Sequence, residues 1–187
     1  MRLFFAVQLP GEVKETLRPA LEAARSVAGD SVGLSRVEQL HFTLAFIGET
    51  DRLEDAAAAA EAVRGLPQFE LAIGSRGAFP NMSRPRVLWI GATDGAPALT
   101  AVAQALSGGL RERGFKLDDR PFQPHLTLGR AKANGAREAR RALEALPKST
   151  LARFTVREIA LVQSVLGSAG ATHTALRRFQ LAPRFPL

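Results

Sequence analysis

One five-residue pattern occurs twice in this chain, and it constrains the fold more than any other feature of the sequence. It reads LHFTL at residues 40–44 and PHLTL at residues 124–128, so two of the three histidines have the same setting. Successive side chains of a β-strand point to opposite faces, and each histidine therefore shares a face with the threonine two residues later. The apolar residues between and after them point to the other face. Each copy predicts a half-buried strand whose polar side carries an imidazole and a hydroxyl group.

The elements expected around the two copies follow one order: a strand, a helix, the strand with the pattern, and a second helix. We expect Pro19 to kink or split the first helix. Thr50 or Asp51 is expected to cap the second helix. The glycines and prolines of 74–85 predict a loop. Apolar spacing predicts helices over 12–28, 51–64, 97–113 and 136–146, and strands over 2–8, 34–37, 41–47, 69–73, 86–91, 125–130, 151–156, 158–165 and 174–181.

This repetition predicts an α+β fold that arose by internal duplication. We expect a pseudo-twofold arrangement in which antiparallel sheets, flanked by helices, form two lobes around a central cleft. No segment is long or polar enough to separate independent domains, so residues 1–187 are expected to form a single bilobal domain.

The composition limits the class of protein. Because the chain has no cysteine, it can form neither disulfides nor thiolate metal sites, which fits the cytoplasmic location that we expect. The apolar run at the amino terminus is short and broken by Gln8 and Pro10, so neither a signal peptide nor a membrane span is expected. The 25 basic residues against 18 acidic ones give a net charge of +7, which favours an anionic partner such as a nucleic acid. The same charge is equally typical of an arginine-rich surface without a specific partner. No obligate protein partner is expected, and the chain should be a monomer.

The chemistry of the repeated pattern points to acid–base catalysis. The unperturbed pKa of imidazole lies nearest neutrality among side chains, so a histidine can accept or donate a proton at pH 7. One histidine on each side of a cleft suits in-line displacement at phosphorus, where one activates the entering oxygen and the other protonates the leaving oxygen. Thr43 and Thr127 could donate hydrogen bonds to the non-bridging oxygens. From the residues alone, either histidine could be the acid or the base.

Two other chemistries fit the pattern less well. Two histidines without cysteine or paired carboxylates are a poor set of metal ligands, and no metal site is expected. A nucleophilic threonine is disfavoured because the side chain two residues from its histidine on a strand points parallel to it.

Five blocks of sequence carry a resemblance to a known family. They are RLFFAV at the amino terminus, HFTLAFIGE and FQPHLTLGR around the two copies of the pattern, FPNMSRPRVLWIG before the second copy, and REIALVQSVLG near the carboxyl end. In these blocks the chain resembles the 2H phosphoesterases, and more narrowly the RNA 2′,3′-cyclic phosphodiesterases, also called 2′-5′ RNA ligases. The resemblance implies hydrolysis of RNA 2′,3′-cyclic phosphate ends to 2′-phosphate ends, without metal or nucleotide cofactor. Reversible 2′-5′ ligation would use the same groups with their roles exchanged.

The resemblance also implies roles for individual residues. His41 would be the proton donor to the leaving 3′ oxygen and His125 the proton acceptor that activates water, with Thr43 and Thr127 binding the substrate. Arg130 matches an arginine common in the family and is a candidate phosphate contact. Strict alternation, however, puts Arg130 on the face opposite His125, so this contact requires the strand to twist or end there.

Some residues and alternatives stay open at this point. His173 lies in a broken copy of the pattern, THTA, and we interpret it as structural or as a peripheral substrate contact. The aromatic residues Phe4, Phe5, Phe46, Trp89 and Phe122 could include a base-stacking surface, although most of them must belong to the core. The pattern specifies the phosphate and not the rest of the substrate. The alternatives are an enzyme acting on another cyclic phosphate or a 2′-5′-linked nucleotide, and a non-catalytic module that binds RNA ends.

Overall fold

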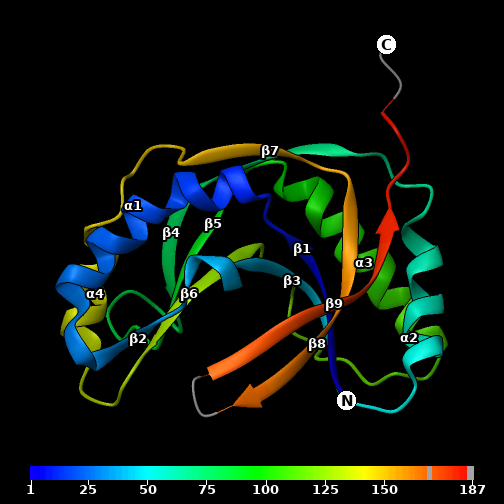
Figure 1. The fold of residues 1–187 in the computed structure, drawn as a ribbon, viewed down its shortest axis with the longest axis horizontal. Coiled ribbons are helices and arrows are strands. Elements are labelled where there is room, and N and C mark those ends of the chain that lie inside the picture. Colours follow the sequence, from blue (N-terminus) through cyan, green and yellow to red (C-terminus); the bar gives the residue numbers. More distant parts are fainter. Residues whose placement is uncertain (168–169, 185–187) are drawn as a thin grey trace.

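A computed structural model of the protein describes residues 1–167 and 170–184 (Figure 1). The helices are α1 (Gly11–Ala28), α2 (Leu53–Ala59), α3 (Ala96–Glu112) and α4 (Ala136–Glu144), with the 3₁₀ turns η1 (Gly29–Ser31), η2 (Val37–Gln39) and η3 (Ala60–Val63). The strands are β1 (Arg2–Gln8), β2 (Val32–Leu34), β3 (His41–Glu49), β4 (Phe69–Phe79), β5 (Val87–Asp94), β6 (His125–Ala131), β7 (Ala152–Val156), β8 (Glu158–Gly167) and β9 (Gly170–Gln180).

The strands form one antiparallel sheet, and equivalent strands of its two halves follow the same order outward from the centre. The order is β7-β4-β5-β6-β3-β1-β8-β9, with β2 added to β6. Each His-x-Thr strand, β3 or β6, is followed outward by an equivalent strand, β1 or β5, and the two halves meet where Phe42 of β3 pairs with Leu126 of β6. The expected α+β fold with a duplicated antiparallel arrangement is confirmed. The two sheets expected from the sequence are continuous with each other at this bridge.

The helices cover the face of the sheet that carries most of the core. Helices α1 and α4 lie side by side at one end, and α2 and α3 at the other (Figure 1). Leu3, Phe5 and Val7 of β1 belong to the main core, whereas Phe4 and Ala6 join a smaller cluster with β8 on the other face. Because both of its faces are covered, β1 is a continuous apolar run and does not alternate.

Both His-x-Thr strands have an irregular register at the same position. Phe5 and Ala6 of β1 pair with Ala45 and Thr43 of β3, which leaves Leu44 as an extra residue. In the same way β5 pairs with Gly129 and Thr127 of β6 and leaves Leu128 extra. An extra residue of this kind is a β-bulge, after which side chains change faces relative to strict alternation. The bulges therefore return Phe46 and Arg130 to the face of the histidines.

Several local expectations were wrong. Residues 74–79 are not a loop, because β4 continues to Phe79 and pairs with β5. Gly77 allows this pairing, since a Cβ there would collide with the ring of Trp89. Of the two outcomes expected at Pro19, a kink or a split, the split does not occur: α1 runs from Gly11 to Ala28, with buried residues on both sides of the proline. Helix α2 is shorter than expected and continues as the 3₁₀ turn η3. It begins after Arg52 and has no side-chain cap. The Thr50 hydroxyl instead accepts a hydrogen bond of 3.1 Å from the backbone amide of Arg52.

Candidate active site

The two histidines of the repeated pattern are held by identical hydrogen bonds. Nδ1 of His41 lies 2.7 Å from the carbonyl oxygen of Gln39, and Nδ1 of His125 lies 2.7 Å from that of Gln123. A carbonyl oxygen only accepts hydrogen bonds, so the proton of each neutral ring must sit on Nδ1. Nε2 of each ring is then the nitrogen available to accept or deliver a proton.

The pairing of β3 with β6 sets the histidines relative to the threonines. Phe42 and Leu126 are cross-strand partners in an antiparallel pair. Continuing that register by one residue in each direction places His41 opposite Thr127 and Thr43 opposite His125. The four polar side chains thus share one face, and each histidine faces the threonine of the other copy. This arrangement could surround one phosphate group with two imidazoles and two hydroxyls.

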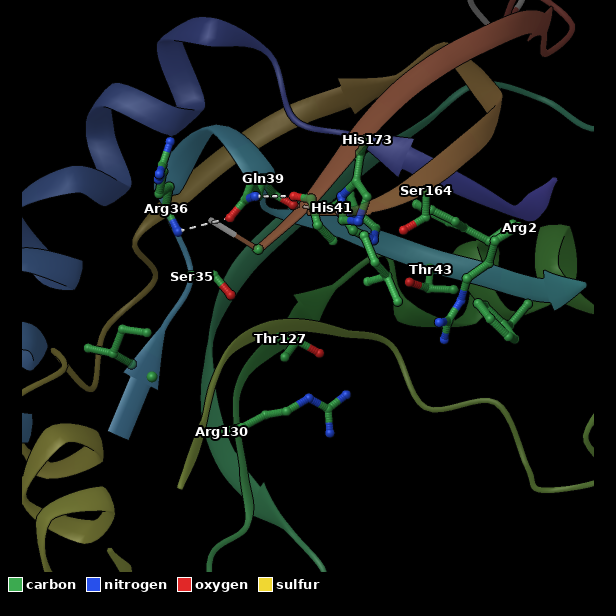
Figure 2. Close-up of a pocket in the computed structure, with 17 residues that line it drawn as sticks. Arg2, Ser35, Arg36, Gln39, His41, Thr43, Thr127, Arg130, Ser164 and His173 are labelled. Atoms are coloured by element: carbon green, nitrogen blue, oxygen red, sulfur yellow. Dashed lines mark hydrogen bonds between the residues drawn. The ribbon is translucent and has the colours of Figure 1, made fainter. Parts of the chain in front are cut away.

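Four of the five site residues expected from the sequence line a single cavity of about 550 Å³ on this face (Figure 2). They are His41, Thr43, Thr127 and Arg130. His125 is not among the lining residues. The pairing of β3 with β6 nevertheless places it opposite Thr43, which does line the cavity.

The cavity is strongly basic and has one exposed aromatic wall. Arg2, Arg36 and Arg130 line it, and no aspartate or glutamate is among the described residues of its wall. Phe46 is 48% exposed there, and the guanidinium of Arg2 lies 5.0 Å from the centre of its ring. Of the five aromatic candidates, Phe4 and Phe5 are buried and Trp89 and Phe122 do not line the cavity, so Phe46 is the one best placed for base stacking. Phe46 occupies the same place after the first pattern as Arg130 after the second, and this correspondence could have identified it from the sequence.

Arg130 reaches the cavity despite the expectation from strict alternation. The β-bulge at Leu128 and Gly129 shifts the strand by one residue, so that Arg130 lies on the same face as Thr127. A β-bulge has no clear signal in a single sequence. The family resemblance, and not the strand pattern, identified this residue.

Burial keeps the histidines neutral in the free protein. It lowers the pKa of His41 to about 4, against the opposing effect of the Gln39 hydrogen bond and with further lowering by the charges of His173, Lys14 and His125. Burial likewise lowers the pKa of His125, as does the positive charge of Arg130. The pKa of His173 is lowered by burial as well. All three imidazoles are therefore mostly uncharged near neutral pH in the free protein.

His173, interpreted from the sequence as structural or peripheral, lies in the wall of the cavity (Figure 2). Its ring centre is 5.0 Å from that of His41, in an edge-to-face arrangement. Nε2 of Gln39 donates a hydrogen bond of 2.6 Å to the carbonyl of Ala171, which fastens β9 beside the turn that precedes His41. The pairing of β9 with β8 thus brings together residues that are far apart in the chain.

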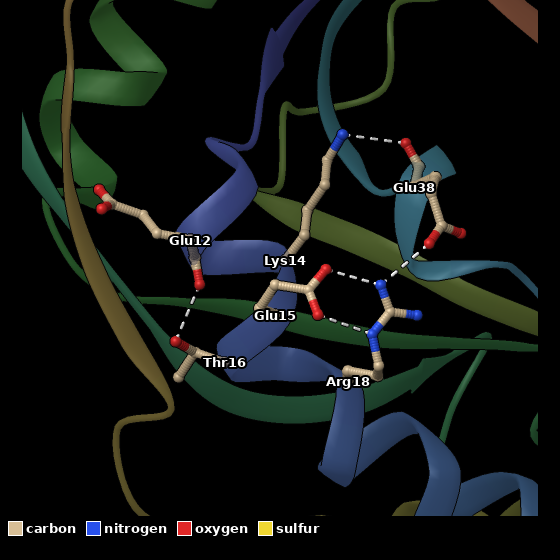
Figure 3. Close-up of polar contacts among 6 residues, drawn as sticks. All are labelled: Glu12, Lys14, Glu15, Thr16, Arg18 and Glu38. Carbon is tan, nitrogen blue, oxygen red and sulfur yellow. Dashed lines mark hydrogen bonds and ion pairs between the residues drawn. The ribbon is translucent and has the colours of Figure 1, made fainter.

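Polar contacts with α1 position the turn η2 that leads into β3 (Figure 3). Nη2 of Arg18 contacts the carboxylates of Glu15 at 2.7 Å and Glu38 at 3.1 Å, and Nζ of Lys14 donates to the carbonyl of Glu38 at 3.0 Å. Exposed ion pairs of this kind each stabilise a protein by at most about 1 kcal/mol. Their role here is to fix the segment that carries the Gln39 carbonyl.

The described ranges contain neither a cluster of metal ligands nor a helix suited to a membrane. Within 1–167 and 170–184, no group of three or more His, Cys, Asp or Glu residues is arranged to hold a metal ion. No helix in those ranges is both long and apolar enough to cross a membrane.

Comparison with known proteins identifies the family. The family model for the 2′-5′ RNA ligase superfamily matches residues 13–167, which is most of the chain. The chain belongs to the 2′-5′ RNA ligase superfamily. Among its curated relatives, an RNA 2′,3′-cyclic phosphodiesterase of Archaeoglobus fulgidus is 33% identical, over 96% of this chain and 100% of that protein. One of Escherichia coli is 31% identical over 96% of each chain.

Solved structures agree with this assignment to the 2′-5′ RNA ligase superfamily. A crystal structure of a Thermus thermophilus protein has a TM-score of 0.81 and 32% identity, covering 97% of this chain and 98% of that one. Escherichia coli LigT complexed with 3′-AMP has a TM-score of 0.75 and 27% identity, covering 96% and 97%. The superfamily fold thus extends over nearly the whole of this chain.

Proposed function

We propose that this protein is a metal-independent RNA 2′,3′-cyclic phosphodiesterase that opens the cyclic phosphate to a 2′-phosphate. The observation that carries the proposal is the matched pair His41 and His125, each with Nδ1 bound to a carbonyl and each facing the threonine of the other copy. The curated relatives bear the name of this activity. In this proposal residues 1–187 act as one domain, because the site takes side chains from both halves of the sheet.

The proposed reaction is an in-line displacement at phosphorus. Nε2 of neutral His125 takes a proton from water, whose oxygen attacks the phosphorus. The bond from phosphorus to the 3′ oxygen breaks, and Nε2 of protonated His41 gives its proton to that oxygen. Thr43 and Thr127 donate hydrogen bonds to the non-bridging oxygens, where charge develops. Bound phosphate raises the pKa of His41 because the nearby anion favours the imidazolium, so His41 can then carry the proton that it delivers.

The position of the cavity supports this assignment of acid and base. The cavity is large enough for a nucleotide and is lined by His41, Phe46 and Arg130 but not by His125. A nucleoside stacked on Phe46 would bring its ribose oxygens to the His41 side of the phosphate. The leaving 3′ oxygen then lies near His41, and the opposite side, near His125, is open to water. Ligation of a 5′-hydroxyl end would be the reverse reaction with the two roles exchanged.

Hydrolysis of a short RNA with a 2′,3′-cyclic phosphate end, measured in EDTA, tests the proposal. We expect turnover to a 2′-phosphate product, and losses of at least about 100-fold in His41→Ala and in His125→Ala, since general acid–base catalysis contributes about 10²–10⁴-fold. Arg137→Ala, on the exposed side of α4, is the matched control and should retain activity. Full activity in either histidine variant would refute the two-histidine mechanism. A 3′-phosphate product would mean that the other ester bond breaks, and binding without turnover would favour an RNA-end binding module.

A further inference from the structure

We propose that His173 is a substrate-binding residue whose Nε2–H donates a hydrogen bond to an oxygen of the nucleotide held in the cavity. This inference rests on the proposed function, because it concerns the same cavity. It assigns a role to a histidine that lies outside both copies of the His-x-Thr pattern. Its basis is the surroundings of the two ring nitrogens.

The position of the ring is fixed by its neighbours. Phe4 is 4% exposed and forms the floor beneath both histidines, with ring centres 4.9 Å from His41 and 5.2 Å from His173. His173 meets each of these rings edge-on, at 86° to His41 and 77° to Phe4. Three rings in mutual contact leave His173 little freedom to turn, so its nitrogens face defined directions.

The two nitrogens of His173 differ in their surroundings. Nδ1 is buried and has no hydrogen-bond partner among the described residues. Buried N–H groups without an acceptor are rarer in native proteins than buried acceptors without a donor, so the proton belongs on Nε2. Nε2 is not buried in this way, and the residue lines the cavity. Since burial lowers the pKa of His173, the ring is neutral near pH 7 and presents one N–H donor to the cavity.

This tautomer is the opposite of the one that His41 and His125 adopt. His41 and His125 donate from Nδ1 to carbonyls, so their Nε2 atoms are free to accept a proton. His173 has its proton on Nε2 and can only donate there. The surroundings thus suit His41 and His125 to proton transfer and His173 to binding an acceptor. The oxygen atoms of a ribose phosphate supply such an acceptor.

The donor is also confined to one end of the site. β9 pairs with β8 as far as Gly170, and the carbonyl of its Ala171 accepts a hydrogen bond from Gln39, two residues before His41. The equivalent strand at the other end, β7, pairs with β4 only from Phe69 to Ile73. At the His125 end, Phe79 lies 5.0 Å and Trp89 6.4 Å from the imidazole, and the indole N–H of Trp89 is buried, so it does not present a donor to the cavity. An extra hydrogen-bond donor therefore distinguishes two ends that the pseudo-twofold symmetry would otherwise make alike. It would hold the nucleotide at the His41 end.

Nitrogen-15 NMR of the imidazole side chains tests the protonation state without any substrate. At pH 7.5 we expect the proton of His173 on Nε2 and the protons of His41 and His125 on Nδ1. Signals are assigned by the loss of one set in His41→Gln, His125→Gln or His173→Phe. A proton on Nδ1 of His173 would overturn the inference, whatever reaction the protein catalyses.

Kinetics of His173→Phe test the contact itself. Phenylalanine fills the same space without a donor, so we expect KM for the cyclic-phosphate RNA to rise about tenfold, which is the typical effect of losing one hydrogen bond to a charged or strongly polar group. kcat should change less than threefold, and His173→Gln should recover part of the affinity through its amide N–H. Thr174→Ala, an exposed neighbour on β9, is the control. An unchanged KM in His173→Phe would refute the role. Absence of turnover in the unaltered protein would refute the proposed function, and the NMR result would still decide the state of His173.

Discussion

The two histidines of the repeated pattern have matching hydrogen bonds but different surroundings. His41 packs against Phe4 and His173, and its pKa is lowered to about 4. His125 packs against Phe79 and Trp89, and its pKa is lowered by burial and by the charge of Arg130. The repeated sequence therefore supplies two equivalent groups, and the neighbours make them chemically distinct.

The lowered pKa values predict an acidic optimum for kcat/KM. The mechanism needs one protonated and one neutral imidazole, a form that is most abundant between the two pKa values of the free protein. Both pKa values lie below the usual 6.5, so kcat/KM should peak below pH 6.5 and fall as the pH rises through neutrality, because both rings become neutral. Initial rates at low substrate concentration between pH 4.5 and 8.5 measure this profile. A maximum above pH 7 would contradict it.

The exposed ring of Phe46 leads to a second prediction for a single residue, which concerns stacking of the base. Stacking of a base on an aromatic ring contributes about 1–3 kcal/mol, so Phe46→Ala should raise KM for a cyclic-phosphate RNA by about 10-fold or more with a smaller change in kcat. Phe46→Leu keeps bulk without a π-face and should recover little. Met82→Ala, an exposed residue outside the cavity, is the control. Equal KM values in Phe46→Ala and the unaltered protein would show that the base binds elsewhere.

Single residues of the site were predictable to different degrees. His41, Thr43, His125 and Thr127 followed from the pattern because alternation on a strand is a local property. Arg130 and Phe46 depend on the β-bulges, which are set by pairing with β5 and β1. His173 depends on β9 folding back along β8, a contact between distant parts of the chain. Local periodicity has no information about such pairings.

At the scale of elements, one arginine joins β4 to α4. Nη1 of Arg76 donates hydrogen bonds to the carbonyls of Leu143 and Glu144 at 2.6 and 3.0 Å, and also to that of Leu146. The last carbonyls of a helix have no partners within the helix, and a cation near them is favourable. Arg76 therefore acts as a side-chain cap for the carboxyl end of α4.

Removal of this cap should destabilise the protein. Arg76→Met keeps much of the side-chain volume but removes the donors, and we expect the free energy of unfolding to fall by about 2 kcal/mol, as for other hydrogen bonds that involve a charged group. Arg137→Met, on the exposed side of α4, should change it by less than about 0.5 kcal/mol. Urea denaturation of the two variants measures the difference. Equal stabilities would show that Arg76 contributes nothing to α4.

The elements themselves were mostly predictable from apolar spacing. Helices α1, α3 and α4 and the two His-x-Thr strands begin within one or two residues of their expected positions. The main error was in β4, where glycines were interpreted as loop signals. Gly77 instead makes room for the indole of Trp89 on the neighbouring strand. The need for such room arises only after the strands pair.

At the scale of the whole molecule, charge and cavity together predict a salt dependence. The net charge is +7, and Arg2, Arg36 and Arg130 line a cavity whose described wall has no carboxylate. The binding constant of a single-stranded nucleic acid falls with the salt concentration, with an exponent of about 0.7 for each phosphate contacted. For three contacts, kcat/KM for a short cyclic-phosphate RNA should fall by about tenfold or more between 50 and 200 mM KCl.

A smaller substrate provides the comparison for this salt effect. Adenosine 2′,3′-cyclic phosphate has one phosphate, so its kcat/KM should fall much less over the same range. Arg36→Gln should reduce the salt dependence for the RNA and leave that for the mononucleotide nearly unchanged. If RNA and mononucleotide respond equally to salt, the arginines do not contact a second phosphate.

The pairing of β1 with β8 has a consequence for biosynthesis. Arg2 is opposite Ser164 in the sheet, so β1 obtains its second neighbour only after the ribosome has added the roughly 160 residues that lead to β8. At about 5–20 residues per second, the interval is roughly 8 to 30 s. During that time the run LFFAV, which is apolar, uncharged and β-prone, has one side of its backbone unpaired, and such segments aggregate readily. The nascent protein should therefore depend on shielding of β1 until β8 has been made.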